Sequence, residues 1–264
     1  MKRTAATLLI LLSLGAAAAA QTPASKPTRT PAKRAAGAAS KPEATAADEV
    51  ERLLDIWELA QGGAALDNIR TRVVRGHITM SDSNLTGTFE KYMKTPRKVM
   101  LVANTPRGQL IEASDGGRRW LQTPWGGSAS AGDGEEALAR ATSGRRAARW
   151  REYFSAAALK GREFLDGREM IVLAATPHGR PPMLWHFDAR TGLLRKLAFI
   201  NPDAGSGGER LLGVYYDSYA TVDGVKVPAL FRQVYTNFTL TFMVTETTHN
   251  VSIDDALFRD PNEK

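Results

Sequence analysis

Apolar residues recur at helical spacing in the segment that opens the ordered part of the chain. Between residues 47 and 60 the large apolar positions are Val50, Leu53, Leu54, Ile56 and Trp57. Intervals of three and four residues place most of them on one face of an α-helix. Gly62 and Gly63 follow and are typical of a helix end. The pattern therefore predicts one amphipathic helix over residues 47–60.

Beyond this helix the pattern changes to short apolar stretches separated by Asp, Asn, Gly and Pro. Five such stretches follow one another: residues 71–81, 85–94, 97–104, 109–114 and 118–122. Their length and the turn residues between them predict consecutive antiparallel strands. Asp115, Gly116 and Gly117 form a hairpin signal, because glycine accepts positive φ angles.

The strand pattern returns after an interruption. Residues 126–134 are rich in Gly, Ser and Ala and predict a loop, and residues 135–154 predict a helix with an aromatic end. Seven further strands are predicted over residues 161–165, 169–176, 183–187, 193–200, 209–219, 226–235 and 238–251. A short helical turn is expected at residues 253–258. This order predicts an α+β fold with one large antiparallel sheet.

Several predicted strands are apolar at successive positions instead of alternate ones. In residues 183–187, for example, Met183, Trp185 and Phe187 share one face while Leu184 lies on the other. An antiparallel sheet with one wet face should alternate, and two helices are few for so large a sheet. The sheet therefore either curls around its own side chains or keeps an apolar cavity for a ligand. The pattern favours the cavity and leaves the filled core as the alternative.

The N-terminal region differs from the rest in composition. Lys2 and Arg3 precede an apolar run over residues 5–15, and small residues follow up to residue 20, as in a secretory signal peptide. An uncleaved anchor helix is the alternative, although the run is short for a membrane span of about 20 residues. Residues 21–47 hold no large apolar side chain and predict a disordered linker. We expect one folded domain over residues 48–264.

The positive charge of the chain is concentrated in that N-terminal region. Of the net charge of +7, the signal contributes two charges and residues 21–47 contribute a net four, so the folded domain keeps +1. A nearly neutral domain is not typical of a nucleic-acid-binding protein. The chain has no cysteine, which excludes disulfides, thiolate metal sites and a lipid-modified cysteine.

Several short motifs follow one another along residues 50–261. They are residues 87–96 ending in Lys-Thr-Pro, residues 109–116 ending in Asp-Gly with Trp120 and Pro124 beyond them, residues 188–194 reading Asp-Ala-Arg-Thr-Gly-Leu-Leu, residues 219–228, and residues 250–258 with Pro261. In this order they resemble the LolA-like superfamily of periplasmic outer-membrane lipoprotein-sorting proteins. That superfamily also contains the LolB-like receptors and the RseB/MucB stress regulators.

The resemblance implies an unclosed β-barrel of about eleven antiparallel strands, with helices covering its concave face. It implies a periplasmic protein that holds the acyl chain of a lipoprotein or lipid, for lipoprotein sorting or lipid transport. A regulatory or scaffold module of the RseB/MucB type, which binds an envelope protein, is the alternative. The carriers have a lid-fastening arginine before the proline where this chain has Thr95, so the resemblance does not extend to this fastening of the lid or to the open–close cycle that depends on it. The missing cysteine excludes a lipid-anchored receptor of the LolB type.

The candidate ligand-binding residues are large apolar positions of the predicted strands. They are Tyr92, Met100, Val102, Trp185, Phe187 and Phe199, and the lid candidates are Trp150, Tyr153 and Phe154. Removal of apolar area from water would drive binding, at about 25 cal/mol per Å². A slip of one residue in register would move any of these side chains to the other face of the sheet.

Groups that could carry catalysis or hold a metal are sparse. The four histidines are His77, His178, His186 and His249. They show no metal-ligand spacing, so we predict no metal and no cofactor. The sequence holds no nucleophile elbow and no phosphate-binding glycine motif, and we predict a binding protein and not an enzyme. Four arginines within residues 145–151 could meet an anionic head group or an acidic partner, with a solvated helix face as the alternative.

Overall fold

The computed structural model describes most of the predicted domain. The described residues are 45–81, 85–95, 98–116, 118–123, 128–129, 150–151, 154–178, 182–199 and 211–260. The predicted signal peptide, nearly all of the predicted linker and most of the predicted helix over residues 135–154 lie outside them. The helix prediction is wrong for Phe154, the last residue of that segment, because Phe154 begins a strand.

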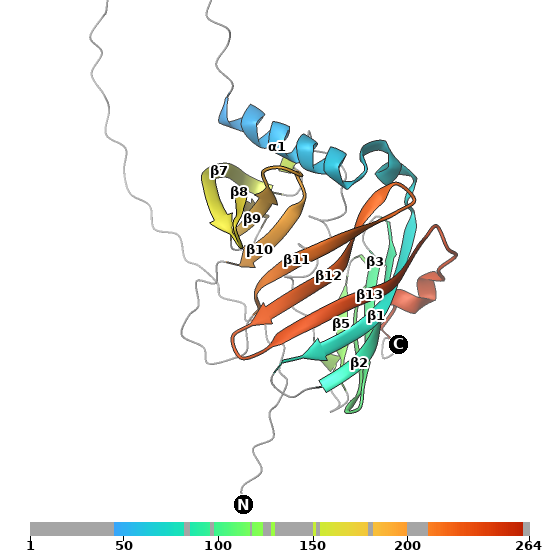
Figure 1. The fold of residues 1–264 in the computed structure, drawn as a ribbon. Helices are drawn as coiled ribbons and strands as arrows, with labels where there is room; N and C mark the ends of the chain where they lie inside the picture. Colours follow the sequence, from blue (N-terminus) through green and yellow to red (C-terminus); the bar gives the residue numbers. More distant parts are fainter. Residues whose placement is uncertain are drawn as a thin grey trace, which may run out of the picture.

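Thirteen strands of the described residues form one antiparallel sheet (Figure 1). They are β1 (Thr71–Met80), β2 (Leu85–Lys94), β3 (Lys98–Thr105), β4 (Gly108–Ser114), β5 (Arg119–Gln122), β6 (Ser128–Ala129), β7 (Phe154–Leu165), β8 (Arg168–Pro177), β9 (Met183–Asp188), β10 (Leu194–Phe199), β11 (Leu211–Val222), β12 (Val225–Tyr235) and β13 (Thr239–His249). The α+β class and the large antiparallel sheet are therefore confirmed. The count exceeds the expected eleven, in part because the two-residue β6 lies inside the predicted loop.

The strand order shows how the chain winds through the sheet. It runs β6-β5-β4-β3-β2-β1-β13-β12-β11-β10-β9-β8-β7. Neighbours are consecutive in sequence except at the centre, where β1 pairs with β13 and joins the two halves of the chain. Among the described strands, β6 and β7 form opposite edges and do not pair, so the barrel is unclosed as expected.

The register divides the side chains between two faces. One row of cross-strand partners crosses nine strands through Leu159, Leu173, Trp185, Leu197, Val214, Gln233, Leu240, Met80 and Leu85. We call the face with this row the inner face and the opposite one the outer face. Residues of β4 and β12 line one pocket, although these strands would lie about 24 Å apart in a flat sheet. The inner face is therefore concave.

A single α-helix of the described residues, α1 (Ala46–Gln61), and the 3₁₀-helix η1 (Gly63–Asn68) lie over the inner face at the end where β1 begins (Figure 1). A capping box starts α1: the Thr45 hydroxyl accepts from the Asp48 N–H, and the Asp48 carboxylate accepts from the Thr45 N–H. The apolar stripe of α1 packs against strands β7 to β11 through Val50, Leu53, Leu54 and Trp57. The predicted helix and its buried face are confirmed.

Two glycines fix how closely α1 approaches the sheet. Gly192, in the turn between β9 and β10, has a φ of 72°, and a Cβ there would lie 2.8 Å from the Cγ2 atom of Ile56. Gly62, at the end of α1, has a φ of 134°, and a Cβ there would lie 2.6 Å from the Gly224 carbonyl oxygen. Glycine alone permits both the backbone angle and the contact at low energy. The helix is thus held against two turns of the sheet.

The C-terminal 3₁₀-helix η3 (Asp255–Phe258) covers part of the outer face. Phe258 is fully buried and packs with Ile253 against the β3–β5 region. The Trp120 indole Nε1–H donates to the Phe258 carbonyl oxygen at 3.1 Å. The two carboxylate oxygens of Asp255 lie 2.8 Å from the ammonium groups of Lys94 and Lys98. Apolar packing and ion pairing together seat the C-terminal segment on the sheet.

We expect Phe258→Ala to lower the free energy of unfolding by about 3–5 kcal/mol, because it opens a cavity in a well-packed cluster. Urea denaturation followed by circular dichroism measures the change. Val251→Ala, at an exposed position of the same segment, should stay within about 0.5 kcal/mol of the wild type. Equal stability of the two variants would show that η3 does not hold the fold together.

The ion pairs of Asp255 should make stability depend on pH. Hydrogen bonds from Lys94 and Lys98 lower the pKa of Asp255 from 3.8 to about 2. Because this pKa is lower in the folded state, the stabilisation is present above pH 4 and is lost as the pH falls towards 2. The stability difference between the wild type and Asp255→Asn should therefore shrink over this range in denaturant titrations. The control Asp55→Asn, on the exposed side of α1, should show no such narrowing.

Candidate functional site

The inner face is closed where α1 covers it. The Trp57 ring of α1 meets Trp185 edge-on at 5.6 Å and Phe187 at 5.8 Å, measured between ring centroids. Phe154 also meets Trp185 edge-on, with 5.7 Å between the ring centroids. Trp185 and Phe187 are 1% and 0% exposed. This aromatic layer fills the space between α1 and strands β7 to β11.

Five of the nine predicted site residues lie in this layer. Trp185, Phe187, Trp150 and Phe154 are buried members, and Phe199 packs against them while partly exposed. Tyr153 lies outside the described residues. The structure thus brings one group of ligand candidates together with two lid candidates, in a closed arrangement that a ligand could enter only if α1 moved. Ligand contact by these residues stays a prediction.

The other three ligand candidates lie elsewhere. Tyr92 is the cross-strand partner of Val73 on one side and of Met100 on the other, all on the outer face, and Val102 follows Met100 on the same face. All three pack with the cluster beneath η3. The six predicted residues therefore do not line one surface. The physical reason is the alternation of strand side chains, which puts Leu101 and Ala103 of β3 on the inner face and their neighbours on the outer one.

An open apolar groove lies at the end of the inner face away from α1. It holds about 820 Å³, including the part open to solvent. Apolar residues make up most of its lining: Ile78, Met80, Leu85, Leu101, Ala103, Leu110, Tyr235, Phe238, Leu240 and Phe242. The lining also includes Arg107, Glu112 and Gln233. Both halves of the chain contribute, the first through β1 to β4 and the second through β12 and β13.

The middle of the inner face is filled by side chains of the protein. Phe231 stacks on Phe242 with 4.6 Å between ring centroids, and Phe89 meets Phe242 edge-on at 5.1 Å. Phe89 and Phe242 are each 1% exposed. The two alternatives raised by the sequence therefore both apply: the sheet fills its own centre and leaves a groove at one end.

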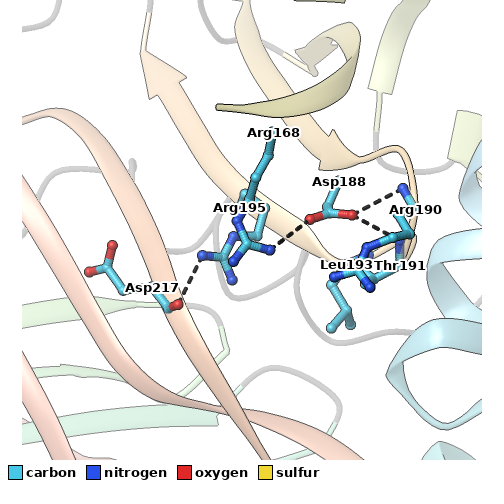
Figure 2. A network of polar contacts seen from close by, with 7 residues as sticks. All are labelled: Arg168, Asp188, Arg190, Thr191, Leu193, Arg195 and Asp217. Atoms are coloured by element: carbon cyan, nitrogen blue, oxygen red, sulfur yellow. Dashed lines mark hydrogen bonds and ion pairs between the residues drawn. The ribbon is translucent and has the colours of Figure 1, made fainter. Parts of the chain in front are cut away.

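A hairpin between β9 and β10 anchors α1 from below, and Asp188 organises it (Figure 2). The Asp188 carboxylate accepts from the backbone N–H groups of Arg190 at 3.0 Å and Thr191 at 2.9 Å, and from the Arg168 guanidinium at 3.4 Å. Burial opposes ionisation, but these hydrogen bonds prevail and the pKa of Asp188 is lowered. This network is the physical basis of the Asp-x-x-Thr-Gly-Leu motif.

The same hairpin is tied to the next strands on its other side. Arg195 donates from Nη2 to the Asp217 carbonyl oxygen at 2.8 Å (Figure 2). The Asp217 carboxylate accepts two hydrogen bonds from Arg232, at 2.7 and 2.8 Å. A bidentate pair of this kind holds its partners in a defined geometry. The hairpin that supports α1 is thereby fixed to β11 and β12.

The described residues show no group of three or more potential metal ligands, and none of their helices is long and apolar enough to cross a membrane.

His186 is buried on the outer face and contacts Glu163 at 2.5 Å. Burial lowers the pKa of His186 against the opposing effect of Glu163. This pair lies on the far side of the sheet from the groove.

No family model matches the sequence, and no curated protein matches it. Solved structures do match the fold. A LolA superfamily protein from Nitrosomonas europaea aligns with a TM-score of 0.54 at 13% identity, and a DUF1329 family protein from Desulfovibrio piger with 0.53 at 14%. A putative outer membrane lipoprotein-sorting protein domain from Vibrio parahaemolyticus aligns with 0.52 at 10%. Each alignment covers 80% of this chain and 97% of the other.

These matches show that the chain has a LolA-like fold, as its motifs implied. The groove residues of this chain were missed by sequence reasoning. In the sequence these residues are marked only by their spacing: Ile78 and Met80 are two residues apart, as are Leu101 and Ala103. That spacing predicts a shared face on each strand but does not predict that β1 pairs with β13.

We expect Asp188→Asn to lower the free energy of unfolding by about 1–3 kcal/mol, because a neutral amide accepts these hydrogen bonds less well. Thermal and urea denaturation measure this loss. Asp166→Asn is a matched control, since Asp166 is an exposed turn residue with a φ of 50° that asparagine adopts equally well. If both variants were as stable as the wild type, the network would not be holding the hairpin.

Proposed function

We propose that the protein is a periplasmic binding protein that shelters an acyl chain of a lipid or lipoprotein in the groove of its inner face. The observation that carries this proposal is the groove itself, a concave and mainly apolar surface with access to solvent. Ligand sites of small molecules are typically concave and lined mainly by apolar side chains. The LolA-like fold and the signal-peptide pattern support the periplasmic setting.

The driving force would be burial of hydrocarbon. Each methylene group removed from water contributes about 0.8 kcal/mol, so a chain of ten methylenes would gain about 8 kcal/mol before the ordering costs of binding. Leu85, Leu110 and Leu240 are partly exposed in the groove and would be covered by such a chain. A role in outer-membrane lipoprotein sorting or lipid transport would follow from holding an acyl chain away from water.

The proposed role requires no covalent chemistry. Apolar side chains dominate the groove, and its two charged residues are Arg107 and Glu112. The groove lining contains no histidine among the described residues. Binding and release are therefore the reactions that this surface supports.

A charge placed in the groove should weaken acyl-chain binding. We expect Leu110→Asp to weaken the binding of a fluorescent long-chain fatty acid by at least about tenfold, because the carboxylate would lose water against the hydrocarbon. Fluorescence titration of the purified protein measures the affinity. Gln109→Asp is the matched control, because the neighbouring side chain on β4 is exposed on the outer face. Equal binding by both variants would contradict the proposed site.

Native mass spectrometry of the protein purified from its own periplasm tests the same proposal without added probe. A co-purifying lipid or lipidated peptide would support it. An empty protein captured together with an envelope protein would contradict it and favour the regulatory or scaffold alternative.

A further inference from the structure

We infer that the inner face also carries a site for the anionic head group of an amphiphile, formed by Arg72, Lys91 and Thr247 next to the hydrocarbon groove. This inference rests on the proposed function, because it identifies which class of amphiphile the groove accepts. The three residues come from the neighbouring strands β1, β2 and β13. The register places all three on the inner face.

The positions of these residues follow from the two ladders that flank β1. Val74 is the cross-strand partner of Lys91 on one side and of Thr247 on the other. Arg72 precedes Val74 by two residues on the same face, so both partners lie diagonally to Arg72, at about 7–8 Å along the ladder. Long side chains such as Arg and Lys can span this distance. The cluster also borders the groove, because Lys91 is the cross-strand partner of Leu101, which lines it.

Arg72 is a partly buried cation that lacks a carboxylate partner in the described part of the chain. Its guanidinium donates from Nε to the Nε2 atom of His249 at 2.9 Å, and this is its one hydrogen bond there. Burial lowers the pKa of Arg72 to about 10, which still leaves it charged at neutral pH. A charge that is partly withdrawn from water and has no counter-charge is unfavourable, and an anion at this position would lower that cost.

His249 orients the guanidinium so that its free edge remains available. The ring of His249 contacts Asp223 through Nδ1 at 2.9 Å. Because Nε2 accepts from Arg72, Nδ1 must carry the proton and donate to Asp223. The Nε edge of Arg72 is thereby occupied, and its two Nη groups are left as a planar pair of donors. Paired donors of this kind match the oxygens of phosphate and carboxylate groups.

Thr247 provides an independent sign of a ligand at the same place. Its hydroxyl is buried and has no hydrogen-bond partner among the described residues. Buried polar groups are nearly always paired, and this one lies one diagonal step from Arg72 on the β1–β13 ladder. Lys91 adds a second cation that forms no ion pair in the part of the chain that the structure describes. The row of cross-strand partners that contains Lys91 continues through Leu101 to Glu112 on β4. The Glu112 position is therefore two strands, or about 10 Å, away from Lys91.

Arg75, three residues after Arg72 on β1, differs from Arg72 in having carboxylate partners. It lies on the outer face, and its guanidinium is 3.6 Å from the Glu90 carboxylate and 3.2 Å from that of Glu246. One arginine of this strand is therefore neutralised within the protein, while the other faces the groove side without a counter-charge. This difference provides a matched control on the same strand.

The test compares two lysolipids with the same acyl chain, lysophosphatidylglycerol and lysophosphatidylcholine, on the full chain by isothermal titration calorimetry. We expect the wild type to bind the anionic lipid at least about tenfold more tightly. Arg72→Met should remove the preference and keep the binding of the zwitterionic lipid. Arg75→Met should leave both affinities unchanged.

Further variants keep the test decisive if Arg72→Met does not fold. Lys91→Met should reduce the preference severalfold, and Arg72→Lys should retain part of it, because a lysine keeps the charge without the planar donor pair. Equal binding of the two lipids by the wild type would overturn the anionic site and leave the proposed function standing. Binding of neither lipid would overturn both.

Inorganic phosphate separates a head group from a free ion. We expect phosphate at millimolar concentration to compete weakly with lysophosphatidylglycerol and not to affect lysophosphatidylcholine. Phosphate that bound as tightly as the anionic lipid, and lost its affinity in Arg72→Met, would assign the site to a free anion and overturn the head-group inference.

Discussion

The pairing of β1 with β13 is the interaction on which the rest of the structure depends. It joins the first half of the chain to the second and is the one pair of neighbouring strands in the described sheet that are distant in sequence. Through this pairing Ile78 and Met80 come to lie beside Leu240 and Phe242, and the groove obtains walls from both halves. The same ladder sets Arg72 beside His249. Without it the chain would form two separate meanders, neither of which could enclose an apolar surface.

Part of the apolar surface of the inner face is buried and stabilises the fold, and another part remains accessible to solvent. Beneath α1 the tryptophans and phenylalanines pack edge-to-face and are buried almost completely. In the centre the phenylalanine stack around Phe242 excludes solvent. Towards the far end Leu85, Leu110 and Leu240 remain partly exposed. The closed regions supply the burial that stabilises a curved sheet, and the open end can therefore stay unfilled without loss of the fold.

Local patterns in the sequence predicted local structure well. The three- and four-residue spacing from Val50 to Trp57 identified α1 and its buried face, and the Asp-Gly turns located the hairpins. The motif around Asp188 pointed to a hairpin whose hydrogen bonds the structure shows. Phe154 was misplaced in a helix, because an aromatic cluster after a charged stretch reads equally well as the start of a strand. The site was harder to predict, because the face of each strand depends on register. Tyr92 and Met100 are large and mainly apolar, as Leu101 is. Only the register of β2 and β3 relative to β1 places Tyr92 and Met100 on the outer face beneath η3.

The central claim is that hydrocarbon occupies the open end of the inner face. A crystal structure of the protein with a fatty acid brominated near its methyl end would test this directly, because the anomalous signal of bromine reports where the chain lies. We predict a bromine peak between β4 and β12, in contact with Leu110 and Leu240. Absence of any peak in the groove, or a peak beneath η3 on the outer face, would contradict the account.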